Sequence, residues 1–120
     1  MRWHKRPWVL WEKLTILGPG TRHEETWELV DTVDETFPGA RTAKDACVLK
    51  QILRWRETKN LLKDPKLLAD GWRDRNPEIP QKFSEELTRF VFADVIEPRG
   101  RSSWQWSYLC LPQKIDPRPR

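Results

Sequence analysis

The chain has 120 residues, of which 38% are hydrophobic and 33% charged, the size and composition of one soluble globular domain. No apolar run approaches the roughly 18 residues that cross a bilayer, and the basic N-terminus lacks a secretory cleavage pattern, so we expect neither a membrane nor a secreted protein. The net charge of +4 and pI of about 9.3 favour a polyanionic partner. Two cysteines are too few for a disulfide framework and predict a reducing, cytoplasmic location, or a nuclear one in a eukaryotic host.

The first predicted elements are a basic arm and a helix. Residues 1–7 lack apolar periodicity and carry Arg2, Lys5 and Arg6, which predicts a flexible arm. Residues 8–17 show the apolar spacing of a helix, although residues 14–17 taken alone also fit a strand, and Gly18-Pro19-Gly20 ends either element.

Two further helices are predicted from capping patterns. Thr21 and Glu24 form a capping box ahead of an acidic helix that Pro38-Gly39 closes, and its apolar residues recur every three or four positions. Thr42 and Asp45 repeat the pattern before a second helix that runs to about Asn60. This helix is rich in lysine and arginine, and its predicted solvent face holds Lys50, Arg54, Arg56 and Lys59.

The remaining elements are two helices, a hairpin and a tail. Asp64-Pro65 is typical of a helix start and predicts a short helix, and a further helix is expected around Phe83 to Val91. Residues 104–111 alternate in the manner of a strand and predict a hairpin with residues 92–97. Residues 113–120, with their prolines, predict an extended basic tail.

Together these elements predict an α+β fold that is mainly helical. Three to five short helices followed by a C-terminal β-hairpin make a single globular domain over residues 8–112, and this order permits a winged-helix arrangement with Arg99 and Arg101 at the wing tip. The predicted core consists of apolar residues on the helical stripes, together with two further tryptophans: Trp27, Val30, Leu49, Leu53, Leu68, Phe83, Leu87, Phe90, Trp11 and Trp55.

The placement of tryptophan beside basic residues predicts a binding function. The chain has eight tryptophans, most of them next to lysine or arginine, and such pairs can stack on bases or anchor protein interfaces. The first hypothesis is a small basic accessory protein that binds DNA or RNA, with its phosphate contacts at Lys50, Arg54, Arg56, Lys59, Arg99 and Arg101. In composition the chain is similar to accessory proteins of viruses and mobile elements.

A second hypothesis is a protein-interaction module or assembly subunit that docks on a protein partner or a second copy through Trp3 and Trp8. The basic residues of the helix fit an ordinary solvated face equally well. No nucleophile with its base, no phosphate-binding glycine loop and no metal-ligand spacing is visible, because His4, His23 and the cysteines are far apart in the sequence. We therefore expect neither an enzyme nor a cofactor or metal site.

Overall fold

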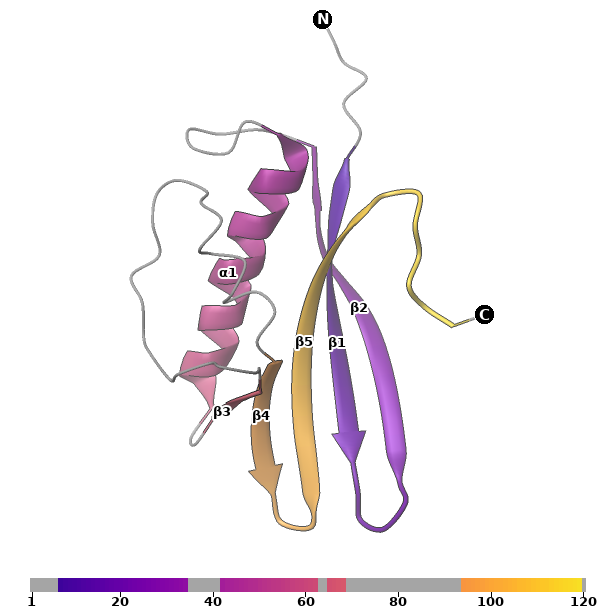
Figure 1. Ribbon diagram of the computed structural model, residues 1–120, viewed down its shortest axis with the longest axis vertical. Helices are drawn as coiled ribbons and strands as arrows, with labels where there is room; N and C mark the ends of the chain where they lie inside the picture. The colour runs from indigo at the N-terminus through magenta and orange to yellow at the C-terminus, as the bar shows by residue number, and fades with distance from the viewer. Residues whose placement is uncertain (1–6, 35–41, 63–64, 69–93, 120) are drawn as a thin grey trace, which may run out of the picture.

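The computed structural model describes residues 7–34, 42–62, 65–68 and 94–119. Over these residues the chain forms a five-stranded antiparallel sheet with a long helix packed on one face (Figure 1). The elements in chain order are β1 (Trp8–Leu17), β2 (His23–Val33), α1 (Ala43–Leu61), β3 (Lys66–Leu68), β4 (Asp94–Arg99) and β5 (Ser102–Pro112). The strands lie in the order β2-β1-β5-β4-β3.

The prediction of a mainly helical fold is wrong. Residues 8–17 and most of residues 21–37, both predicted as helices, form the β1–β2 hairpin. Residues 66–68, predicted to begin a helix, form β3 and pair with β4. The winged-helix arrangement is wrong for the same reason, and the helix predicted around Phe83 lies outside the described residues.

Strand β1 resembled a helix because it is buried on both faces. It lies between β2 and β5, so Leu10 packs toward α1 while Val9 and Trp11 are buried on the opposite face. A central strand with two covered faces loses the apolar-polar alternation that marks a half-exposed strand. Its apolar residues then fall at spacings that a helix would also show.

Strand β2 resembled a helix because a β-bulge interrupts its alternation. The register with β1 shifts between Leu10 and Trp11, where Leu10 pairs with Asp31 and Trp11 with Leu29. The extra residue, Val30, reverses which side chains face α1. The bulge thus places Val30 and Val33 on the same face of the strand although they are three residues apart. The sequence analysis assigned this spacing to one face of a helix.

Helix α1 confirms the prediction for residues 42–60. Thr42 is the N-cap, and its side-chain oxygen accepts a hydrogen bond from the backbone N–H of Asp45 at 3.1 Å. The acidic Asp45 in the first turn and the basic Lys59 in the last turn complement the helix dipole. The helix packs across β5 and β1 and more lightly on β2 and β4.

The C-terminal hairpin is also present, as β4 and β5, with Val95 opposite Trp106. The two strands begin and end within a few residues of the predicted ranges, and Gly100 and Arg101 form the turn. The hairpin does not stand apart as a wing, because β5 also pairs along its whole length with β1. Strand β5 is the central strand of the sheet.

The core lies between α1 and the sheet. Trp55, Cys47 and Leu49 from the helix pack with buried residues of four strands, namely Leu10, Val33, Val95 and Tyr108. Trp11, Leu49 and Trp55 confirm their predicted burial, whereas Leu53 is 52% exposed and Trp27 and Val30 are half-buried. The other predicted core residues have no described side-chain position.

The sheet face opposite α1 is partly covered by the C-terminal segment. The backbone N–H of Gln113 donates to the carbonyl of Pro7 at 3.0 Å, which holds the two ends of the described chain together. Beyond this contact the Arg118 guanidinium lies 5.2 Å from the centre of the Trp11 ring, within cation–π range. None of the helices in the described residues is both long and apolar enough to span a membrane.

Candidate functional site

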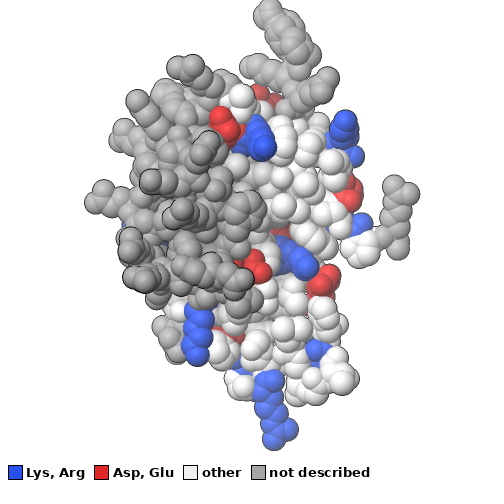
Figure 2. All heavy atoms as spheres, in the orientation of Figure 1, with Lys and Arg blue, Asp and Glu red and all other residues white. Residues whose placement is uncertain are grey.

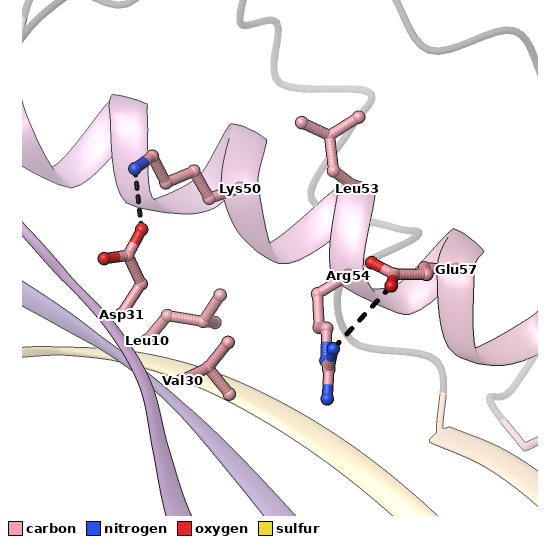
Figure 3. Close-up of a pocket in the computed structure, with 7 residues that line it drawn as sticks. All are labelled: Leu10, Val30, Asp31, Lys50, Leu53, Arg54 and Glu57. Carbon is pink, nitrogen blue, oxygen red and sulfur yellow. Dashed lines mark hydrogen bonds and ion pairs between the residues drawn. The ribbon is translucent and has the colours of Figure 1, made fainter.

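A shallow groove of about 230 Å³ separates α1 from β1 and β2 (Figure 3). The Lys50 ammonium on α1 donates to the Asp31 carboxylate on β2 at 2.6 Å. One turn further, the Arg54 guanidinium lies 3.5 Å from Glu12 and 3.9 Å from Glu57. The groove therefore holds cations that are already paired with carboxylates of the same molecule.

Two of the four basic residues that were predicted to form a solvent face of α1 are paired with the sheet instead. Lys50 and Arg54 point toward the sheet, and the ammonium of Lys59 lies 5.6 Å from the centre of the Trp55 ring. Burial disfavours the charged guanidinium of Arg54, but the Glu12 carboxylate, together with Tyr108 and Glu57, outweighs burial and raises the pKa of Arg54. Of the four predicted helix cations, Lys50 and Arg54 hold α1 on the sheet, and a phosphate would have to compete with their carboxylates.

A buried polar network lies beneath Arg54. The hydroxyl of Tyr108 donates to a carboxylate oxygen of Glu12 at 2.7 Å and forms a further hydrogen bond with Thr58. The Gln51 side chain donates to the carbonyl of Tyr108 at 2.9 Å. Burial raises the pKa of the Tyr108 phenol. These hydrogen bonds join side chains of α1 to β1 and β5, so the network helps to fix the helix on the sheet.

The turns of the two hairpins lie side by side and form a basic tip (Figure 1). The hydroxyl of Ser102 donates to the carbonyl of Gly18 at 3.1 Å. A Cβ atom at Gly18 would lie 2.6 Å from the carbonyl oxygen of Arg101, and φ there is +85°, so this approach requires glycine. Arg22 is thereby brought to the same end of the sheet as Arg99 and Arg101.

The arginines of this basic tip differ in their surroundings. Arg99 is paired with Glu97, and its guanidinium lies 4.1 Å from the centre of the Trp104 ring. Arg22 is paired with Glu24 at 2.9 Å. Arg101 is exposed and makes no ion pair within the described residues. The predicted position of Arg99 and Arg101 at a hairpin tip is confirmed, and the fold adds Arg22 to them.

Acidic and basic side chains are mixed on the face of the described residues that Figure 2 shows. Figure 2 shows red and blue side chains next to one another on the visible face, without a broad field of one sign. The described residues hold almost as many carboxylates as cationic groups. A polyanion would therefore meet little long-range attraction from this part of the molecule.

The face opposite α1 exposes apolar side chains beside the C-terminal segment. Trp11 pairs with Leu29 on one side and Leu109 on the other, so the three form a row across β2, β1 and β5. The outer two are 49% and 37% exposed. Trp27 follows in the next row, with its ring 6.5 Å from that of Trp11 and the Lys13 ammonium 5.5 Å from its centre.

The two tryptophans predicted to contact a protein partner are placed differently. Trp3 lies outside the described residues. Trp8 is half-buried at the start of β1, packs against the core, and has the Lys44 ammonium 5.6 Å from the centre of its ring. The indole of Trp8 therefore contributes to the fold as well as to the surface.

The two cysteines are neighbours in space, although the sequence separates them widely. Cys47 on α1 and Cys110 on β5 are free thiols that contact each other. The hydrogen bond with Cys47, together with burial, raises the pKa of the Cys110 thiol. A raised pKa keeps the thiol protonated, so this pair behaves as core and not as a nucleophile. Within the described residues no group of histidine, cysteine and carboxylate side chains is arranged to hold a metal ion.

Two features of these surfaces were missed by sequence reasoning. Glu12 is the one carboxylate in the mostly apolar segment 8–17, and that was the available signal for a buried carboxylate. The acidic segment around Glu24 to Asp31 was recognised, but as a helix, so its role as the outer strand of a sheet could not be foreseen. No family model matches this chain, and no curated protein or solved structure matches it either.

Proposed function

We propose that the protein is a protein-interaction module that binds its partner on the sheet face opposite α1. The observation that carries this proposal is the row of Leu29, Trp11 and Leu109, whose outer members remain exposed on an otherwise well-formed sheet. Single exposed leucines are ordinary, but here two exposed leucines flank one buried tryptophan on the same sheet face, and clustered apolar side chains within a polar rim are typical of binding surfaces. Trp27 adds an aromatic side chain to the same surface.

The charge pattern favours a protein over a nucleic acid as the partner. A nucleic-acid surface needs cations that are available to phosphate, and here Lys50 and Arg54 are engaged by carboxylates across the helix-sheet groove. The rim of the apolar row is mixed, with the Lys13 ammonium 3.3 Å from Glu25. Mixed charge around an apolar centre is the usual anatomy of a protein interface.

Photo-crosslinking tests this proposal in cells that produce the protein natively. A photoreactive amino acid at position 29 or 109 should give adducts of discrete mass with a partner protein, because both side chains lie on the proposed surface. The same amino acid at Leu61, which is 78% exposed at the end of α1, is the matched control. Mass spectrometry of the adducts identifies the partner.

The affinity for that partner gives the second part of the test. Leu29→Asp should weaken binding by about tenfold or more, since burying a carboxylate against apolar side chains is unfavourable. Leu61→Asp should leave the affinity unchanged. Adducts that form equally at all three positions, or not at all at positions 29 and 109, would contradict the proposal.

Nucleic-acid binding remains a second candidate because of the basic tip. Arg101 is exposed without an ion pair in the described part of the chain. The Arg99 guanidinium lies over the Trp104 ring, and an aromatic ring beside a cation is the arrangement on which single-strand binders stack bases. If phosphate is bound there, Arg101→Glu should reduce the slope of log affinity against log salt by about 0.9 on duplex DNA. Fluorescence titrations with generic single- and double-stranded DNA and RNA measure the slope.

Arg56→Glu is the control for this second candidate, because Arg56 belongs to the helix face that the sequence analysis favoured and makes no ion pair in the described residues. A salt slope that changes with Arg56→Glu and not with Arg101→Glu would place the phosphate contacts on α1. A salt slope near zero for the unaltered protein would exclude both.

A further inference from the structure

The outer edge of β2 is long and has no pairing strand. β2 spans His23–Val33 and pairs with β1 on its inner side, and no other strand of the described residues pairs with it. Every second residue of an edge strand points its backbone N–H and C=O groups away from the sheet. Such an edge can accept a further strand through main-chain hydrogen bonds.

The side chains of β2 select the charge of that added strand. Its 11 residues include Glu24, Glu25, Glu28 and Asp31, and no lysine or arginine. Glu28 makes no ion pair within the described residues. The pairs of Glu24 with Arg22 and of Glu25 with Lys13 and His23 are exposed to solvent, which weakens them and lets them be exchanged. Pairing β2 of two copies would bring acidic side chains together on both strands, which disfavours self-association through this edge.

The two faces of β2 differ, and this difference sets a pattern for the added strand. Before the bulge, Trp27 and Leu29 lie on the face opposite α1, in the same rows as Lys13 and Trp11. Glu24 and Glu28 alternate with them and lie on the other face. A strand laid along this edge would meet Trp27 and Leu29 on one face, with Glu25 beyond Trp27, and Glu24 and Glu28 on the other face.

We propose that β2 takes up an extended segment of a partner protein in which lysine or arginine alternates with apolar residues. The basic side chains lie beside Glu24 and Glu28, and the apolar ones beside Trp27 and Leu29. This inference rests on the proposed function, since it names the chemistry by which the partner is recognised at the margin of the same surface. Main-chain hydrogen bonds supply affinity, and the alternation supplies specificity.

The probe for this proposal is a capped, fluorescent peptide in which lysine and valine alternate over about eight residues. Its anisotropy should report saturable binding to the full chain, and binding should weaken as salt is raised. The matching peptide of glutamate and valine should not bind. Binding of the glutamate peptide with similar affinity would overturn the choice of a basic strand.

Backbone methylation separates strand addition from simple charge attraction. One version of the peptide is N-methylated at every lysine and another at every valine. Since a bound edge strand directs only alternate N–H groups toward β2, one version should lose binding by about tenfold or more while the other retains it. Equal affinity of the two versions would overturn the proposal, and this comparison needs no variant of the protein.

A charge change in the protein locates the site. Glu28→Lys should weaken binding of the lysine-valine peptide by about tenfold, whereas Glu57→Lys, the same change on α1, should not. If no peptide binds while position 29 still forms partner adducts, the strand-addition proposal fails and the proposed function stands. If a dimer that depends on Glu28 forms instead, a second copy occupies the edge and the proposal is also overturned.

Discussion

Replacing Trp55 with alanine is expected to lower the free energy of unfolding by about 3–5 kcal/mol, the range for removing a large aromatic side chain from a core. Trp55 is 1% exposed and lies where α1 packs on the sheet, so a large cavity would open beneath the helix. Urea denaturation followed by circular dichroism measures the change. A loss of this size is a large part of the stability of a domain of this length.

Leu53→Ala on the same helix is the matched control. Leu53 was predicted to be buried with Trp55, but it is exposed at the outer edge of the groove (Figure 3). Its removal should change the free energy of unfolding by less than about 0.5 kcal/mol. Similar losses for the two variants would mean that α1 is rotated relative to the packing described above.

Tyr108→Phe is expected to lower the free energy of unfolding by about 1–3 kcal/mol, although it removes a single oxygen atom. The hydroxyl is the common partner of Glu12 and Thr58, and Glu12 is 8% exposed, so the carboxylate would be left buried with fewer hydrogen bonds. Thr58→Val should cost less in the Tyr108→Phe background than in the unaltered protein, because its partner is already missing. If the losses of the two single variants simply add in the double variant, the Tyr108 hydroxyl is not the partner that Thr58 and Glu12 share.

The pH dependence of unfolding gives a second measure of Tyr108. Burial raises the pKa of its phenol in the folded protein above the value of about 10 that it has when unfolded. The stability held by the protonated phenol is therefore fully present below about pH 10 and is lost as pH rises, because unfolding then releases a proton, at up to about 1.4 kcal/mol for each pH unit. This alkaline loss should be absent from Tyr108→Phe.

The parts of the fold that could be predicted are those whose signals are local. The Thr42 and Asp45 cap lies within one turn, and the helix that follows it was assigned correctly. The β4–β5 hairpin was likewise visible from alternation on either side of a short turn. Both patterns can be recognised without knowing which other elements pack on the helix or the hairpin.

The parts that could not be predicted depend on distant partners. Whether residues 8–17 form a helix or a strand is decided by β2 and β5 on either side, and burial on both faces removed the alternation that would have marked a strand. The bulge opposite Leu10 and Trp11 did the same to β2. The capping box at Thr21 and Glu24 was a valid local pattern, and tertiary pairing overrode it.

The candidate surfaces could be predicted in composition but not in arrangement. The basic helix residues were identified, yet their pairing with Asp31 and Glu12 needed strands that the sequence analysis had assigned to helices. Arg99 and Arg101 were placed at a hairpin tip correctly, and Arg22 joined them through a contact between two turns that are distant in the sequence. The exposed row of Leu29 and Leu109 is likewise formed by strands from opposite ends of the chain.

The position of β5 has a consequence for how the protein is made. Strand β5 follows the other described strands in the sequence, yet it lies between β1 and β4 and joins the first hairpin to the rest of the sheet. On the ribosome, the β1–β2 hairpin and α1 emerge before β5, so their apolar surfaces remain uncovered until residues 102–112 have also been made. A truncation that stops short of Ser102 would therefore leave the β1–β2 hairpin with no strand that joins it to β4.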